Sequence, residues 1–168
     1  MATLNLVRSF RTLLLTVLVV GGLTTACKKS GGSDPEIDPR DQYVGIYTGT
    51  YRNTIYFVED GDLYDGTSTI TITKGSNSKE IYLEVVTAGD INGDKKLNVT
   101  AELDGVNFIV IDKNTDTIPI RKNPVSSDYT ASGVFDPNTK LVSYTSVARA
   151  VRNGAQYRQT YEITGTKK

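Results

Sequence analysis

This chain is poor in cysteine and histidine, the side chains that most often act as thiol nucleophile, general base near neutral pH or zinc ligand. The chain contains one cysteine, Cys27, and neither histidine nor tryptophan. Histidine is the commonest general base near neutral pH, and structural zinc sites are built largely from histidine and cysteine. Carboxylate, Ser–Lys and tyrosine chemistry remain open on composition, but no sequence motif indicates any of them. We therefore expect a protein without catalytic residues, without a cofactor and without enzymatic activity.

The segment Asp90–Asn98, DINGDKKLN, has an acidic spacing that resembles a calcium-binding loop. Its oxygen donors would be Asp90, Asn92 and Asp94. A calcium loop of the EF-hand kind also needs glycine at its sixth position and a bidentate carboxylate at its twelfth. Here those positions are Lys95 and Ala101, and Glu102 falls one residue late. We therefore favour a polar hairpin loop over this weak calcium candidate, and we expect no metal site.

The region before Cys27 has the composition of an export signal. Met1–Arg11 contains two arginines and no acid, Thr12–Leu23 is apolar and uncharged, and residues 24–26 are small. A membrane-spanning helix needs about 20 apolar residues, so this run is too short to act as a permanent anchor. Residues 1–26 are therefore predicted to be a signal peptide.

Cys27 and the four residues before it, LTTAC, resemble the lipobox of bacterial lipoproteins of the Bacteroidota type. The resemblance implies that the signal is cut before Cys27, that a diacylglyceryl group is attached to its thiol, and that the new amino terminus is acylated. It also implies an exported protein held by its lipid anchor at the outer membrane, on the periplasmic face or the cell surface. Lys28 stands where an aspartate often retains lipoproteins at the inner membrane. The alternative is an ordinary secretory signal with an unrelated cysteine.

The residues from Cys27 onward divide into a tether and a folded domain. Residues 27–41 are rich in Gly, Ser, Pro and Asp and lack apolar periodicity, which is typical of a flexible linker. Residues 42–168 are enough for one domain with its own core. Once a signal with two arginines is removed, acidic residues slightly outnumber basic ones, so nucleic acid is not an expected partner.

From Gln42 onward, apolar residues alternate with polar ones, which is typical of half-buried strands. In Thr67–Lys74, for example, Ile70 and Ile72 share one face and threonines occupy the other. Strands are predicted at Tyr43–Tyr51, Thr54–Val58, Thr67–Lys74, Glu80–Val86, Leu97–Leu103, Val106–Ile111, Thr117–Arg121, Tyr129–Phe135, Leu141–Val151 and Gln156–Thr164. Turn signals such as Asp104-Gly105 separate them. The pattern predicts an all-β fold, either an antiparallel barrel of about eight to ten strands or a β-sandwich.

Three motifs favour the barrel. YVGIYTGTY at Tyr43–Tyr51, ASGVFDPNTKLVSYT at Ala131–Thr145 and YEITGTKK at Tyr161–Lys168 resemble the lipocalin-like, or calycin-type, β-barrel domains of Bacteroidota lipoproteins. In lipocalins a Gly-x-Trp motif opens the first strand, and a basic residue near the last strand packs on the tryptophan. The resemblance implies that Tyr47 takes the place of that tryptophan and that Arg158, or alternatively Lys167, is its basic partner.

Closure of a barrel would pair Tyr43–Tyr51 with Gln156–Thr164, because a closed sheet leaves no free edge. The alternation in these two strands then assigns the faces. The inward residues of the last strand are expected to be Tyr157, Tyr161 and Ile163. Those of the first strand are expected to be Val44 and Ile46. The outer face of the first strand would then present Tyr43, Tyr47 and Tyr51 as a surface for a protein partner or a sugar.

Three functional classes fit these features. The first is a membrane-anchored lipoprotein of the cell envelope whose non-catalytic barrel meets an envelope protein or a glycan through its outer surface. The second is a lipocalin-like carrier of a small apolar or amphipathic ligand, and the third is an inhibitor or periplasmic accessory protein. We rank the first slightly above the second, because the side chains of a small barrel can fill its interior. A structure with either a closed core or an open, apolar-lined mouth would separate them.

The lipidation of Cys27 can be tested directly. The wild-type chain should incorporate a clickable fatty acid and partition with membranes, because two or more acyl chains give stable anchoring. The Cys27→Ala variant should incorporate none. Label retained in the alanine variant would show that the anchor is not attached to this thiol.

Overall fold

The computed structural model describes residues 37–57, 60–89, 93–120 and 124–168. The chain divides into two compact units, Met1–Ile37 and Asp38–Lys168, and the description below concerns the second. Cys27, the predicted signal peptide and most of the predicted tether lie outside the described residues. In the described part of the chain, no helix is both long enough and apolar enough to cross a membrane.

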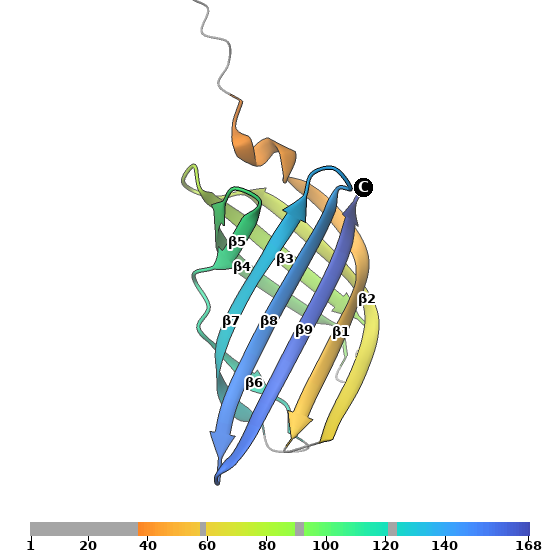
Figure 1. The fold of residues 1–168 in the computed structure, drawn as a ribbon, viewed down its shortest axis with the longest axis vertical. Helices are drawn as coiled ribbons and strands as arrows, with labels where there is room; N and C mark the ends of the chain where they lie inside the picture. The colour runs from red at the N-terminus through yellow and green to blue at the C-terminus, as the bar shows by residue number, and fades with distance from the viewer. Residues whose placement is uncertain (1–36, 58–59, 90–92, 121–123) are drawn as a thin grey trace, which may run out of the picture. The chain divides into compact units, whose positions relative to one another are not determined.

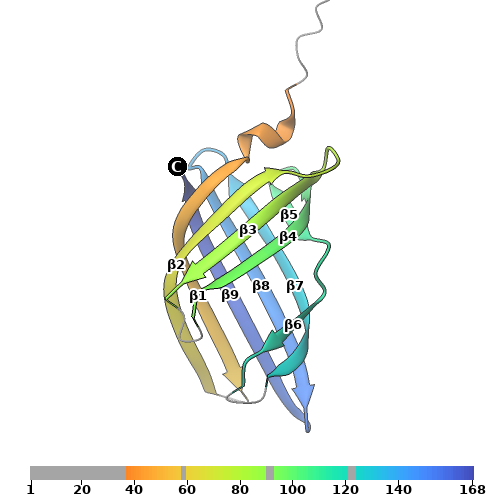
Figure 2. The same cartoon turned by 180° about the vertical axis from the view of Figure 1, so that it is seen from behind.

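The second unit is an all-β, lipocalin-like barrel of antiparallel strands (Figures 1 and 2). A short 3-10 helix, η1 (Pro39–Gln42), precedes the strands. The strands are β1 (Gly45–Phe57), β2 (Asp60–Lys74), β3 (Glu80–Ala88), β4 (Lys95–Asp104), β5 (Asn107–Val110), β6 (Thr115–Ile118), β7 (Val125–Asp136), β8 (Leu141–Arg152) and β9 (Ala155–Lys167). Their order in the sheet is β5-β4-β3-β2-β1-β9-β8-β7-β6, and a pairing of β5 with β7 closes the barrel. β6 is the extra strand, paired with β7 beyond the end of β5.

The predicted barrel is confirmed, and the sandwich alternative is excluded because the sheet closes on itself. The predicted pairing of the first and last strands is also confirmed, with Tyr51 opposite Ile163. The segments predicted at Tyr43–Tyr51 and Thr54–Val58 form one continuous strand, β1. Asn53 lies between them and is fully buried, so the inward alternation continues through a polar residue that the hydrophobic pattern does not register.

The inward face of β1 is the opposite of the one predicted. Tyr43, Tyr47 and Tyr51 are only 4%, 2% and 2% exposed, whereas Ile46 is 47% exposed. A tyrosine ring buries more apolar surface than valine or isoleucine, provided that its hydroxyl finds a partner. The Tyr47 hydroxyl donates to the carbonyl of Tyr43 at 2.8 Å, and the Tyr43 hydroxyl donates to the carbonyl of Gly105 at 3.1 Å. The prediction of an exposed tyrosine surface is therefore wrong.

The two candidates for the basic partner of Tyr47 lie in different places. Arg158 is exposed on the outer face of β9, and its guanidinium carbon lies 4.2 Å from the centroid of the Tyr56 ring. Lys167 lies directly opposite Tyr47 in the pairing of β1 with β9, and its ammonium donates to the carbonyl of Gln42 at 3.0 Å. The position next to Tyr47 therefore belongs to Lys167, the alternative in the sequence-based prediction.

The barrel half next to η1 has a packed apolar core. The Tyr43 ring stacks on Phe135 at a centroid distance of 4.4 Å, and Phe108 lies 5.0 Å from Phe135. The aliphatic members of this core include Ile70, Ile72, Ile81, Leu83, Val99, Ala101, Leu103 and Val142. Ile81 and Leu83 follow the alternation predicted for their strand. Side chains therefore fill this half of the interior.

η1 lies at the end of the barrel where the chain ends (Figure 1). Arg40 fastens it to the turn between β2 and β3 by donating to the carbonyls of Gly75, Asn77 and Glu80. The hydrogen bond from Arg40 also holds the pKa of the Asp38 carboxyl well below its usual range. The compact unit thus begins at Asp38, a few residues before the boundary predicted at Gln42.

Two adjacent residues of β5 test the packing of the core. Phe108 is 1% exposed and Ile109 is 55% exposed. Truncating a buried phenylalanine removes transfer free energy and leaves a cavity, so Phe108→Ala should lower the free energy of unfolding by about 3–5 kcal/mol. Ile109→Ala should lower it by less than about 1 kcal/mol. Urea denaturation followed by circular dichroism measures both, and equal losses would contradict the assigned faces of β5.

Candidate functional site: a polar cavity inside the barrel

The barrel interior becomes more polar in the half that lies away from η1. There, nearly every strand turns a polar side chain inward: Asn53, Ser68, Thr87, Lys95, Asp116, Ser127, Ser146 and Gln159. Small barrels are normally filled by interlocking apolar side chains, and burying a polar group is costly unless it finds a partner. This polar layer therefore needs an explanation beyond the packing of the barrel.

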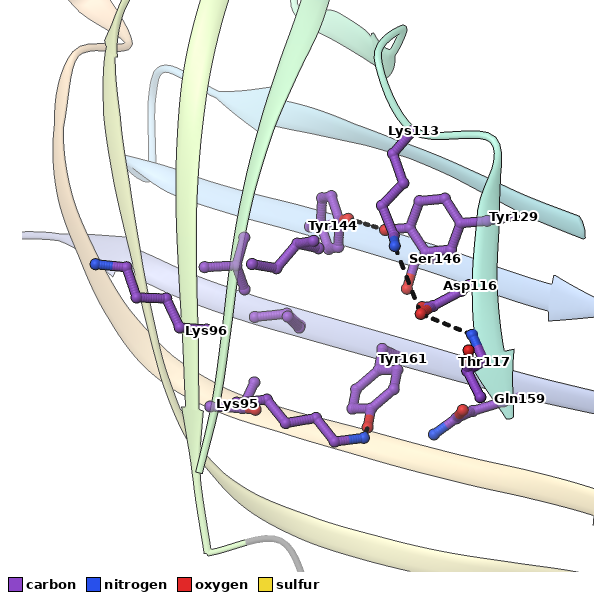
Figure 3. A pocket seen from close by; sticks show the side chains of 14 residues that line it. Lys95, Lys96, Lys113, Asp116, Thr117, Tyr129, Tyr144, Ser146, Gln159 and Tyr161 are labelled. Atoms are coloured by element: carbon purple, nitrogen blue, oxygen red, sulfur yellow. Dashed lines mark hydrogen bonds and ion pairs between the residues drawn. The ribbon is translucent and has the colours of Figure 1, made fainter. Parts of the chain in front are cut away.

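Five members of this polar layer, Thr87, Lys95, Asp116, Ser146 and Gln159, line a cavity of about 390 Å³. Figure 3 shows this cavity from close by. Its walls come from β3, β4, β6, β7, β8, β9 and the segment before β6. The cavity is lined by Val85, Thr87, Lys95, Lys96, Leu97, Lys113, Asp116, Thr117, Tyr129, Tyr144, Ser146, Gln159, Tyr161 and Ile163, and the Lys96 ammonium points away from it (Figure 3). A second apolar cluster, built on Ile55, Ile118 and Ala148, packs separately from the main core. The cavity volume lies within the range of small-molecule sites, about 300–1,000 Å³.

The cavity opens through the wall between β4 and β6. β4 pairs with β5 only from Ala101 to Asp104, and β6 pairs with β7, so no strand pairing among the described residues joins Lys95–Leu97 to β6. Figure 2 shows β4 and β6 on the same side of the barrel, apart from each other. The side chains of Lys113 and Asp116 at this opening are 24% and 41% exposed, whereas the residues at the back of the cavity are almost completely buried.

Two lysines enter the cavity from opposite sides (Figure 3). The Lys95 ammonium donates to the Tyr161 hydroxyl at 2.6 Å and lies 5.2 Å from the centroid of that ring. The Lys113 ammonium lies 4.8 Å from the centroid of Tyr129 and 3.5 Å from a carboxylate oxygen of Asp116. Asp116 therefore balances Lys113, whereas no described carboxylate lies within ion-pair distance of Lys95. Among the described residues that line the cavity, lysines outnumber carboxylates.

A chain of hydrogen bonds holds Tyr161 beneath Lys95. The side-chain amide of Gln159 donates to the Asn53 side-chain carbonyl at 3.0 Å, and the Asn53 amide donates to the Tyr161 hydroxyl at 3.1 Å. Asn53 and Gln159 are 0% and 3% exposed, so their geometry is fixed by packing as well as by hydrogen bonds. Buried networks of this kind make the position of each member well defined. Lys95 is thus presented to the cavity on a rigid support.

Tyr129 and Tyr144 form the back wall, and their hydroxyl oxygens lie 2.6 Å apart. Burial raises the pKa of both phenols, most strongly that of Tyr144. Both hydroxyls therefore stay protonated at physiological pH. They can donate and accept hydrogen bonds, but neither is poised as a nucleophile or a general base.

None of the sequence-predicted site residues that the structure describes lines the cavity. Cys27, Asp90 and Asn92 are outside the described residues, and Asp94 is exposed just before β4. The described part of the chain contains no group of three or more acidic, histidine or cysteine residues that could hold a metal ion. Tyr43, Tyr47 and Tyr51 are buried and do not line the cavity.

Sequence reasoning missed Lys95 because it was assigned to a polar loop. The signal was present, since the alternation of Leu97–Leu103 extends backward by one step to place Lys95 on the inward face. Lys113 and Asp116 lie between two predicted strands, and no periodicity marks them. Barrel closure is what places these two residues in the same cavity as Lys95.

The fold and the site together define a class: a lipocalin-like antiparallel barrel with a cationic cavity that opens through its wall. No protein-family model matches the chain, and no curated protein matches it. The functional argument therefore depends on the geometry described above.

The raised pKa of Tyr144 predicts a pH dependence of stability. Below about pH 10 both the folded and unfolded states keep the phenol protonated. Above it the unfolded state releases the proton while the folded state retains it, so stability falls as pH rises. The free energy of unfolding should drop less between pH 9 and pH 11 in Tyr144→Phe than in wild type, by about 1 kcal/mol. Urea denaturation at the two pH values measures this, and equal drops in both proteins would contradict the burial of this phenol.

Proposed function

We propose that this chain is an anchored binding protein of the cell envelope, and that its barrel takes up a small amphipathic molecule in the cavity. The carrying observation is the cavity itself, about 390 Å³ in volume and open on one side of the barrel. A barrel whose function lay only on its outer surface would have no need of this space. The observation favours the carrier function, ranked second from the sequence, over the surface-interaction function.

The lining fits a molecule with both apolar and polar parts. Val85, Leu97 and Ile163 offer aliphatic surface, and the tyrosine rings add flat apolar surface. Lys95, Ser146 and Gln159 offer polar groups from different strands. Binding sites for small molecules typically combine a mainly apolar wall with a few polar groups that fix orientation.

The surface-interaction function was predicted to use Tyr43, Tyr47 and Tyr51 as a contact surface. These three residues are buried, so they cannot form that surface. Binding is also favoured over catalysis. The chain has no histidine, and burial raises the pKa of the Tyr129 and Tyr144 phenols, which keeps both protonated. For binding, the tyrosine hydroxyls need only donate and accept hydrogen bonds, and their geometry allows this.

The anchoring part of the proposal is supported by the sequence. Residues 1–26 have the composition of an export signal, and LTTAC resembles a lipobox at Cys27. A lipid on Cys27 would tie the barrel to the outer membrane through residues 27–37. The partners of the protein would then be the membrane, through the lipid, and a small ligand, through the cavity.

A cavity-filling substitution tests the proposed site. The neutral fluorescent probe N-phenylnaphthylamine should bind the purified mature protein, residues 27–168, saturably, because its two aromatic groups match the aliphatic and aromatic part of the cavity lining. Ser146 is buried at the cavity wall, and a phenylalanine there would occupy the space. Ser146→Phe should weaken binding about tenfold or more, which corresponds to at least about 1.4 kcal/mol.

Ser143 provides the matched control, since it lies on the same strand but is exposed on the outer face. Ser143→Phe should bind the probe as wild type does. Circular dichroism checks that both variants are folded. If Ser146→Phe is folded and binds the probe with wild-type affinity, the cavity is not the binding site.

A further inference from the structure

We infer that the cavity binds an organic anion and holds its acidic group against Lys95 and Thr87; this inference rests on the binding function proposed above. The anion would carry a carboxylate, sulfonate or phosphate-type group on a small apolar body. Three observations on neighbouring strands lead to this assignment.

The first observation is a row of three donors across the barrel wall. Ser68 on β2 lies directly opposite Thr87 on β3, and Thr87 lies directly opposite Lys95 on β4. All three are at inward positions of their strands. Directly opposed residues have Cβ atoms about 4.5–5.5 Å apart, so one acidic group could contact neighbouring members of the row.

The second observation is that two of these donors have no hydrogen-bond partner among the described residues. Thr87 is 4% exposed and Ser68 is 5% exposed, and neither hydroxyl makes a hydrogen bond with a described residue. Thr87 borders the cavity, and Ser68 lies beside it in the row. A buried hydroxyl without a partner is destabilising, so native proteins rarely keep one without a reason. A ligand oxygen that accepts from Thr87 would supply that reason.

The third observation is the charge. Lys95 donates one hydrogen bond to Tyr161, and its ammonium group carries three N–H donors. No carboxylate of the described residues neutralises it, whereas Lys113 across the opening has Asp116. A positive charge in a partly enclosed site, with donors still available, favours a negatively charged partner.

The remainder of the cavity indicates the body of the ligand. Leu97 follows Lys95 by two residues on the inward face of β4, and Val85 stands directly opposite Leu97 on β3. Ile163 adds a third aliphatic wall. An acidic group at Lys95 would therefore have an apolar body beside it, and the volume limits that body to a small molecule.

A matched pair of probes tests the inference. Anilinonaphthalene sulfonate is N-phenylnaphthylamine with an added sulfonate, so the two differ only in the anionic group. Both are titrated by fluorescence into the purified mature protein, residues 27–168. The sulfonate should bind about tenfold more tightly, the gain expected from a charge-assisted hydrogen bond in a partly buried site. Equal affinities, or tighter binding of the neutral probe, would overturn the inference.

Lysine variants locate the preference. Lys95→Met should abolish the preference for the sulfonate, because it weakens the binding of the sulfonate and leaves the affinity for the neutral probe unchanged. Lys96 is the control, because its ammonium points away from the cavity in Figure 3 and pairs with Glu84 at 2.7 Å. Lys96→Met should keep the preference. A preference that survives Lys95→Met, or that Lys96→Met also removes, would contradict the assigned subsite.

Thr87→Val separates a binding role from a structural one. It removes the hydroxyl with little change in shape, so it should weaken sulfonate binding about threefold or more without lowering the stability of the empty protein. A loss of stability with unchanged sulfonate affinity would make Thr87 structural. Failure of both probes to bind would contradict the proposed function itself, whereas neutral-probe binding that Ser146→Phe blocks, without a preference for the sulfonate, would contradict the anion inference alone.

Discussion

Closure of one sheet on itself is the constraint on which the rest of this structure depends. Two pairings close it, β1 with β9 and β5 with β7. Once they form, every second residue of each strand must point into a shared interior of fixed size. The sequence can then either fill that interior with side chains or leave space in it, and this protein does both in different halves of the barrel.

The half next to η1 is filled by rings and aliphatic chains, and η1 is fastened across its end by Arg40. The other half carries inward polar groups on nearly every strand and surrounds the cavity. The extra strand β6 makes this possible, because it continues the edge of β7 without pairing with β4 among the described residues. The wall is thus closed where the core is packed and open where the cavity lies. On the proposed function, stability and ligand binding depend on separate ends of one barrel.

The sequence predicts the strands well because alternation is a local property, and Ile81, Leu83 and Val85 are buried as their spacing requires. The sequence predicts less well which face of a strand points into the barrel. In β1 both faces contain large apolar residues, and the choice between them is made by the register with β9 and by carbonyl partners for the tyrosine hydroxyls, which are long-range features. The sequence predicts the residues of the cavity least well. Lys95 is predicted from the sequence to lie in a loop, and its hydrogen-bond partner Tyr161 comes from β9, which no local pattern connects to it.

The central claim is that the polar half of the barrel is a ligand site and not an imperfect core. A crystal structure of the protein isolated without denaturation from the cells that make it tests this most directly. The account predicts electron density for a small organic molecule in the cavity, with its acidic group within hydrogen-bond distance of Lys95 Nζ and Thr87 Oγ1. A cavity collapsed onto the rings of Tyr129 and Tyr161, with room for ordered water alone, would contradict it.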